Sequence, residues 1–323
     1  MSGRISDGGV LEMLEPVNLV HTLPLLVVAV AVPVLVHRFT FHLGMKKLVH
    51  IGMVRENYRG ERIPTAAGLL LVGNMAVSVL MVALVVNLIG NMMMSSVLFT
   101  LLPGLLCTAL IGWYDDLSTD KAVKGFRGHF GIFFRDKRLT SGLVKAVGVG
   151  VVALTVGGVL TYPEMKTDTG SGATDSNIHL LLQLLTNAAL IALSTNLINL
   201  FDLRPTRAIK VFWLIMVAVL FTTPLFFYPM VWGFFLPVMI ATLLYFPYDA
   251  RGQVMLGDTG ANALGFLTGY TLVISCTLPI KLTVVALFVL LHLVAEKVSF
   301  SRVIRSTAWL NRLDEWGRAR DNM

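Results

Sequence analysis

Charged residues are scarce in this chain of 323 amino acids. Asp, Glu, Lys and Arg make up 14% of it, whereas a soluble domain of this size carries about 25%. Hydrophobic residues make up 55%, and the mean hydropathy is +0.75. No segment is both long enough and polar enough to form a separate soluble domain. The shortage of charge therefore excludes an ordinary soluble protein and predicts a single integral membrane domain over residues 1–323.

Cysteine is also scarce, and the two that occur, Cys107 and Cys276, both lie in apolar runs. We interpret them as small packed residues, which excludes a disulfide framework or a cysteine metal site. Residues 1–16 lack the basic start and the small-residue cleavage site of a signal peptide. We expect this segment to be an extracytoplasmic N-terminus and the first helix after it to be retained.

Long apolar runs are what the sequence has in abundance. A transmembrane helix needs about 20 apolar residues, and nine runs approach that length. They predict an all-α, polytopic membrane protein with about nine transmembrane helices and a transmembrane core over residues 17–295. The predicted spans are Val17–Val36, Ala66–Ile89, Ser96–Trp113, Gly142–Leu160, His179–Leu197, Val211–Phe227, Met230–Phe246, Ala263–Leu278 and Leu282–Ala295.

Basic residues are distributed unevenly between the loops that join these spans. Of the 26 Lys and Arg residues, only Arg4, Lys166 and Lys281 fall outside one alternate set of loops and the tail. Cytoplasmic loops carry the excess of Lys and Arg, so we expect the N-terminus outside and the C-terminus in the cytoplasm. We attribute the net charge of +7 to this topology and to phosphate attraction. No soluble nucleic-acid-binding motif accompanies it, so we expect no nucleic-acid partner.

Residues 296–323 form a tail in which apolar and basic residues alternate. This pattern predicts an amphipathic helix that lies on an anionic membrane leaflet.

Four short polar segments interrupt the apolar chain, all on the predicted cytoplasmic side. They are YDD at 114–116, KGFRGHF at 124–130, NLINLFD at 196–202 and MLGDTGAN at 255–262. Carboxylates at the ends of transmembrane helices are costly unless their charge is compensated. A divalent metal and a phosphate-bearing substrate would compensate it, which favours a membrane enzyme over a structural membrane protein.

Asp115 and Asp116 directly follow the third predicted span. Adjacent carboxylates repel each other unless a cation lies between them. Two hard oxygen ligands at a membrane surface suit Mg²⁺, which takes one or two carboxylates and completes its shell with waters and substrate phosphates. A solvated helix end is an equally good interpretation of this pair taken alone.

Asp258 lies between Gly257 and Gly260, just before the eighth predicted span. The glycines permit a close approach of the backbone to a ligand. Thr259 is placed to cap the coming helix, whose N-terminus favours an anion. The alternative is a simple Gly/Asp turn that opens a helix.

Asn196, Asn199 and Asp202 recur at intervals of three residues at the end of the fifth span. On a helix this spacing places them on one face. The amides can hydrogen-bond a base or a sugar, and the carboxylate can bind a ribose hydroxyl or a metal. Polar packing between helices is the alternative.

The loop after the Asp pair is basic, and part of its charge follows from the topology alone. Lys121, Lys124 and Arg127 are the residues best suited to bind a phosphate. His129 could carry a proton, although a surface histidine more often has no such role.

The order of these segments is more specific than any one of them. PTAAG occurs at 64–68, a DD pair follows the third span, NxxNxxD closes the fifth and MxGDxG precedes the eighth. This order resembles the polyprenyl-phosphate N-acetylhexosamine-1-phosphate transferase superfamily. Its members include phospho-N-acetylmuramoyl-pentapeptide transferase and the UDP-N-acetylglucosamine–undecaprenyl-phosphate transferases. The resemblance covers roughly residues 63–296.

The resemblance implies a Mg²⁺-dependent enzyme of the bacterial plasma membrane, with its active site facing the cytoplasm. Such an enzyme transfers a sugar 1-phosphate from a UDP-sugar to a polyprenyl phosphate such as undecaprenyl phosphate and releases UMP, in peptidoglycan or other envelope polysaccharide synthesis. It contacts membrane lipids. The family also implies a homodimer, although the charge and spacing of the residues give no evidence about dimerisation.

The resemblance also implies roles for the polar residues. Asp115 and Asp116 would be catalytic, serving the lipid phosphate and the metal, and Asp258 would be a Mg²⁺ ligand. Lys121 or Lys124 would contact a phosphate. The residues implied to bind the nucleotide-sugar are Asn196, Asn199 and Asp202.

The chain departs from the family pattern at three points. The family usually follows the loop aspartate with Gly-Leu-Asp-Gly, but LRPTR follows Asp202, so Pro205 takes the place of the second aspartate. Ala67 replaces one glycine of the PTxGG motif. The histidine cluster of the pentapeptide transferase is absent, which favours UDP-N-acetylglucosamine over UDP-MurNAc-pentapeptide as the donor.

Two other functions compete with the transferase. A catalytically inactive relative that binds polyprenyl phosphate and regulates envelope synthesis is motivated by Pro205. An ion-coupled transporter would need carboxylates near the middle of the membrane, whereas these carboxylates cluster at one boundary.

Overall fold

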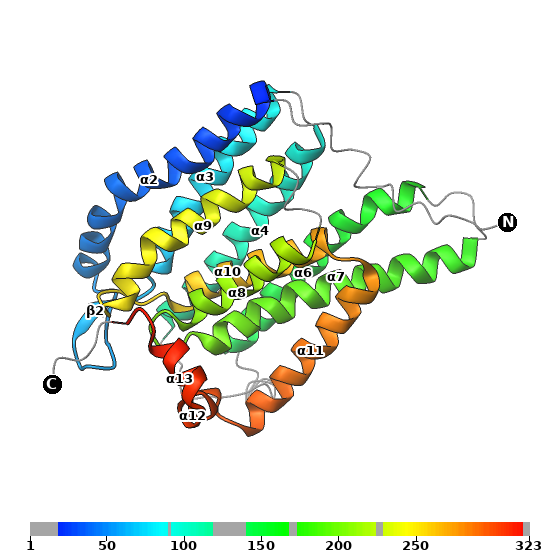
Figure 1. Ribbon diagram of the computed structural model, residues 1–323. Helices are drawn as coiled ribbons and strands as arrows, with labels where there is room; N and C mark the ends of the chain where they lie inside the picture. Colours follow the sequence, from blue (N-terminus) through cyan, green and yellow to red (C-terminus); the bar gives the residue numbers. More distant parts are fainter. Residues whose placement is uncertain (1–18, 90–91, 119–139, 168–172, 224–228, 319–323) are drawn as a thin grey trace.

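The computed structural model describes residues 19–89, 92–118, 140–167, 173–223 and 229–318, which form eleven helices and one two-stranded hairpin (Figure 1). The long helices are α2 (Leu19–His50), α3 (Gly68–Leu88), α4 (Met92–Leu117), α6 (Ser141–Thr167), α7 (Ala173–Phe201), α8 (Arg207–Thr222), α9 (Pro229–Ala250), α10 (Gly257–Ser275) and α11 (Leu278–Lys297). Two short helices, α12 (Phe300–Ser306) and α13 (Ala308–Glu315), follow, and the hairpin pairs β1 (Val54–Glu56) with β2 (Arg62–Pro64). The helical, membrane-type architecture predicted from the sequence is confirmed, and the hairpin is an addition to it.

Seven helices in the described part of the chain are long and apolar enough to cross a membrane. These candidate spans are Thr22–His50, Gly68–Leu88, Leu98–Leu117, Ser141–Tyr162, Asn177–Phe201, Val231–Ala250 and Leu278–Lys297. Of the other two predicted spans, α8 has 16 residues, and α10 begins with the polar sequence GDTG. The outer faces carry large exposed apolar side chains, such as Val147 on α6 and Leu290 on α11. That exterior suits lipid.

Helix α10 lies at the centre of the bundle and is buried from Thr259 to Val273. It packs most extensively against α7 and α4, and also against α3 and α8. Glycines bring the backbones together: a Cβ on Gly269 would lie 2.6 Å from the Cα of Ile191, and a Cβ on Gly265 would collide with the backbone of Thr195. Small residues let helices approach closely in membranes, and here they fix the position of α10.

The hairpin and the PTAAG segment are tied to the start of α10 by backbone hydrogen bonds. Met255 N–H donates to the Pro64 carbonyl at 2.9 Å, and Ala67 and Gly68 donate to the carbonyls of Met255 and Leu256, both at 3.0 Å. Two sequence motifs that lie about 190 residues apart therefore form one connected unit. Figure 1 shows this unit, α12 and α13 at one end of the bundle, with the long extensions of α6 and α7 at the other.

The glycine contacts of α10 generate a stability prediction. Gly265→Ala forces α10 away from α7, so we expect a loss of about 1–3 kcal/mol of unfolding free energy. Gly150→Ala is the matched control, because a Cβ at this helical glycine of α6 meets nothing within 4 Å. The control should be neutral or gain up to about 1 kcal/mol from helix propensity. Thermal unfolding in detergent, followed by circular dichroism, compares the two, and equal melting temperatures would contradict the packing described here.

Candidate functional site

The carboxylate of Asp116 lies at the N-terminus of α10. It is buried at the end of α4, with 4% of the residue exposed. One oxygen, Oδ1, accepts the N–H of Asp258 at 3.1 Å, while Oδ2 accepts the N–H of Thr259 at 2.9 Å and its hydroxyl at 2.7 Å. A negative charge is stabilised at a helix N-terminus, where backbone N–H groups lack partners within the helix. Asp116 thus joins α4 to the first turn of α10.

This contact corrects the predicted role of Thr259. The helix begins at Gly257, and Leu256, in the N-cap position, makes no side-chain cap. Thr259 lies inside the first turn and donates to Asp116 instead of capping the helix. The anion expected at this helix end is supplied by the protein itself. Gly257 adopts a φ of +68°, and a Cβ there would lie 2.7 Å from Asp116 Oδ2, so the close approach that glycine permits is to Asp116.

Lys145 links the other two predicted carboxylates. Its Nζ on α6 lies 3.3 Å from Asp258 Oδ1 and 3.8 Å from Asp115 Oδ2. The three side chains are largely shielded, at 13%, 23% and 18% exposed for Lys145, Asp258 and Asp115. The carboxyl groups of Asp115 and Asp258 also lie within hydrogen-bonding reach of each other. The sequence analysis treated Lys145 only as one of the basic residues that set the orientation in the membrane. A lysine inside an apolar run nevertheless indicates a buried partner of opposite charge.

Asp202 follows the last residue of α7 and brings a further carboxyl group to this end of the bundle. Burial of this carboxyl raises the pKa of Asp202 well above its ordinary value, and the charges of Asp249, Asp258 and Asp116 raise it further, against the opposing charge of Lys145. Asp249, near the end of α9, is buried and accepts the N–H of Thr206 at 2.7 Å. Asp249 was not predicted; its signal is a single aspartate at the end of an apolar run.

The remaining predicted residues divide into two groups. Asn196 and Asn199 lie half-buried in the last turns of α7, at the same end as the carboxylates. The predicted phosphate-binding residues and proton carrier lie outside the described residues: Lys121, Lys124, Arg127 and His129.

The donor set fits a hard divalent cation that is shared with a substrate. Within the described residues, no group of three or more His, Cys, Asp or Glu side chains is arranged to hold a metal ion by itself. Asp115 and Asp258, with Asp202 nearby, instead fit an ion that takes one or two carboxylates and completes its shell with waters and substrate phosphates, as Mg²⁺ does. Asp116 is less suited, because it already accepts three hydrogen bonds.

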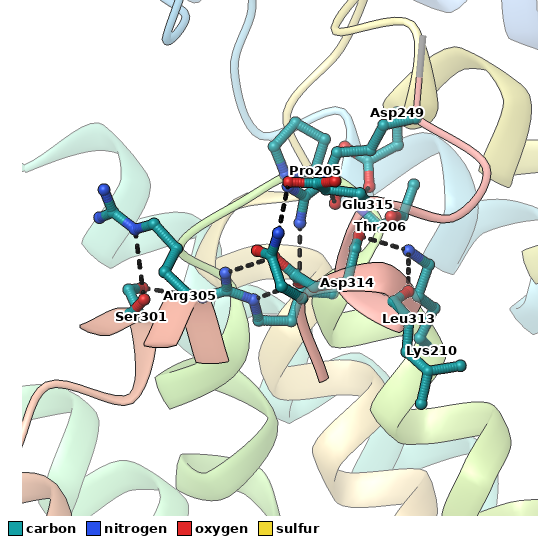
Figure 2. A network of polar contacts seen from close by, with 12 residues as sticks. Pro205, Thr206, Lys210, Asp249, Ser301, Arg305, Leu313, Asp314 and Glu315 are labelled. Carbon is teal, nitrogen blue, oxygen red and sulfur yellow. Dashed lines mark hydrogen bonds and ion pairs between the residues drawn. The ribbon is translucent and has the colours of Figure 1, made fainter. Parts of the chain in front are cut away.

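The tail docks beside the loop that follows Asp202 (Figure 2). Arg207, with 4% of the residue exposed, donates from Nε and Nη2 to the two oxygens of Asp314 at 2.7 and 2.8 Å, and from Nη1 to Ser301 at 2.8 Å. Arg318 pairs with the same carboxylate at 2.7 Å and donates to the Pro205 carbonyl at 3.0 Å. The two parallel hydrogen bonds between Arg207 and Asp314 make a bidentate, charge-assisted pair, which is both specific in geometry and strong.

Docking corrects the prediction of one amphipathic helix in the tail. The described tail is two short helices, α12 and α13, which meet at Thr307. Lys210 donates to the carbonyls of Leu313 and Asp314 at 3.1 and 2.7 Å, where the end of α13 favours a cation. The tail therefore contacts the segment from Leu203 to Arg207.

Comparison with models of known protein families matches none of them, and comparison with curated proteins finds no matching relative. The family resemblance thus rests on the order of the motifs.

The unequal contacts of the Asp pair predict unequal effects of substitution. In Asp116→Asn, the amide NH₂ opposes N–H donors of α10, so we expect a loss of about 1–3 kcal/mol. Asp115→Asn is the matched neighbour. It loses the charge contact with Lys145 at 3.8 Å but relieves repulsion with Asp258, so we expect a change of less than about 1 kcal/mol. Thermal unfolding without divalent cations measures both, and equal destabilisation by the two substitutions would be inconsistent with the assigned contacts.

The docked tail should depend on pH. Burial alone would raise the pKa of Asp314, but hydrogen bonds and charges from Arg207 and Arg318 hold it below its ordinary value. Because the folded pKa is the lower one, the ion pairs stabilise the docked tail fully above pH about 4 and lose that contribution as the pH falls further. We expect the amide hydrogens of α13 to exchange faster with solvent below this pH, after correction for the intrinsic exchange rate.

The same contact can be removed at neutral pH. Asp314→Asn leaves the buried Arg207 without its carboxylate, which costs about 3–5 kcal/mol, so trypsin should cut the tail arginines much faster. Glu315→Gln, an exposed neighbour whose carboxylate bonds only Asn311 in the described structure, should be cut at the wild-type rate. Similar protection of all three proteins would show that the ion pairs do not hold the tail.

Proposed function

We propose that this protein is a Mg²⁺-dependent membrane transferase. It moves a sugar 1-phosphate, an N-acetylhexosamine 1-phosphate, from a UDP-sugar to a polyprenyl phosphate such as undecaprenyl phosphate and releases UMP. The observation that carries the proposal is that Asp115 and Asp258 both contact Lys145. Asp202 lies close enough that the charges of Asp258 and Lys145 shift its pKa. These residues come from three motifs spread over more than 140 positions. A structural membrane protein gains nothing from such costly carboxylates.

The proposal places the site at the cytoplasmic face of a bacterial plasma membrane. It includes nine spans, an outside N-terminus and a cytoplasmic C-terminus. Its support is the asymmetric distribution of Lys and Arg in the sequence. The end of α7, the start of α10, the hairpin and the tail share one end of the bundle (Figure 1), and a nucleotide-sugar would reach that end from the cytoplasm.

The reaction depends mainly on positioning the two phosphate groups and on stabilising their negative charge. An oxygen of the lipid phosphate attacks the β-phosphorus of the UDP-sugar, a new P–O bond gives the lipid pyrophosphate, and the bond to the α-phosphate oxygen breaks to release UMP. The lipid phosphate is already anionic near neutral pH, so the step needs little proton removal. Mg²⁺, when bound, would neutralise phosphate charge and polarise the reacting P–O bonds.

The protein's own residues prepare the site for this step. Lys145 holds Asp115 and Asp258 toward each other, so that two carboxylates face one point. Asp116 fixes the first turn of α10 and with it the backbone of Asp258. Asn196 and Asn199 lie at the same end and would contact the nucleotide-sugar.

A second function is favoured by one observation. The loop that would contact the nucleotide in the resembling family is held by the tail, with the Pro205 carbonyl accepting from Arg318. A catalytically inactive protein that binds polyprenyl phosphate and regulates envelope synthesis would tolerate this change.

A lipid-product assay tests the proposal. Purified protein receives undecaprenyl phosphate, Mg²⁺ and one UDP-sugar at a time, and UMP and lipid pyrophosphate are both measured. We expect product with UDP-N-acetylglucosamine, loss of product with EDTA and recovery with added Mg²⁺. Asp258→Asn should lower turnover by at least about 100-fold, the usual cost of removing one electrostatic contributor. Glu296→Gln, an exposed acidic residue near the end of α11, is the control and should keep the wild-type rate.

Two results would change the assignment. Wild-type turnover by Asp258→Asn would remove this carboxylate from the site. A folded wild-type protein that binds polyprenyl phosphate but releases no UMP from any donor would favour the regulatory function.

A further inference from the structure

The contacts of Asp314 fix which side of the tail faces outward. Arg207 and Arg318 both pair with this buried carboxylate, and Lys210 holds the carbonyl end of α13. With Asp314 directed inward, the opposite side of α13 must face away from the bundle. The outward side is thus set by a specific ion-pair network.

That outward side of α13 is apolar. Trp309 and Leu313 lie four residues apart, which places them on one helical face. They are 63% and 58% exposed. Trp316 follows the helix, and its ring lies near Phe246 and Lys210 of the bundle instead. Large apolar side chains exposed together on a short helix mark an interaction surface.

The same two tail helices carry exposed positive charge. Arg302, Arg305 and Arg312 are exposed, and the first two line an open hollow of about 580 Å³ with Ser299 and Ser306. Of the acidic residues in α13, Asp314 is paired inward, and Glu315 is exposed and accepts from Asn311 at 2.8 Å. The three exposed arginines outnumber this one exposed carboxylate. We call Arg302, Arg305, Trp309, Arg312 and Leu313 the tail face.

The tail face cannot lie far from the bilayer. The candidate span of α11 ends at Lys297 and α12 begins at Phe300, so the link allows a separation of only about 10 Å. Trp and Leu beside Arg on a surface helix bind the boundary between headgroups and acyl chains, and Arg attracts anionic lipids.

We propose that the tail face binds the anionic phospholipid surface of the leaflet at this end of the bundle. The ligand chemistry is a lipid phosphate or another anionic headgroup together with the adjoining acyl chains. The inference is independent of the transferase activity.

A fluorophore on the tail face tests this inference in the complete protein. Leu313→Cys is labelled with an environment-sensitive dye after Cys107→Ser and Cys276→Ser, and the protein is reconstituted into liposomes. In phosphatidylcholine containing phosphatidylglycerol, we expect a blue-shifted emission and roughly two-fold less quenching by acrylamide than in phosphatidylcholine alone. High salt should reverse part of this difference. A label at Tyr58→Cys, exposed in the hairpin at the same end, is the control and should not respond.

Charge variants and competing ligands decide between sources of the signal. Arg302→Gln, Arg305→Gln and Arg312→Gln together should abolish the difference between the two lipid compositions. Inorganic phosphate added to phosphatidylcholine liposomes should not reproduce it, because free phosphate supplies no apolar phase. Equal quenching in the two lipids would overturn the proposal. Protection that required an added protein in place of anionic lipid would also overturn it and would assign the tail face to a protein partner.

Discussion

The contact between the Asp116 carboxylate and the first turn of α10 is the constraint on which the site depends. Close backbone contacts at Gly265 and Gly269 fix the position of α10 against α7. The first turn of α10 therefore lies where Asp116 can accept its N–H hydrogen bonds. The Asp116 carbonyl in turn accepts from Arg55 of the hairpin at 2.7 Å. The hairpin, α4 and α10 therefore meet at one residue. Asp258 is positioned by helix backbone instead of by a loop, and rigid elements place functional groups more accurately than loops do.

The carboxylates at this end of the bundle are compensated to different degrees. Asp116 is compensated by the N–H groups of α10, and Asp249 by the N–H of Thr206. Asp115 and Asp258 share Lys145, and Asp202 lies close enough for Asp258 and Lys145 to act on its charge. Carboxylates this close to one another favour the binding of a proton or a cation. Burial raises the pKa of Asp202, and the charges of Asp249, Asp258 and Asp116 raise it further.

Sequence reasoning located all nine long helices, because an apolar run of about 20 residues has few alternatives to a helix in a membrane. It misplaced ends: α2 continues to His50 beyond the predicted end at Val36, since a helix can leave the apolar region without stopping. The motifs at Asp115, Asp116 and Asp258 were found because acidic residues are conspicuous in an apolar chain. The different roles of these three aspartates could not be predicted, nor could the contacts of Asp115 and Asp258 with Lys145. Both depend on contacts between segments far apart in the sequence, which residue spacing does not encode.

The loop after Asp202 contains a strained turn that two distant segments restrain. Thr206 has a φ of +67°, a conformation that glycine adopts without cost and that costs on the order of 1–3 kcal/mol for other residues. Its N–H bonds Asp249, and the adjacent Arg207 is held by Asp314, 107 positions away. These contacts with α9 and with the tail offset the strain at Thr206, so the conformation of the loop depends on the docked tail. The proposed membrane contact of the tail face would therefore act on this loop through Asp314.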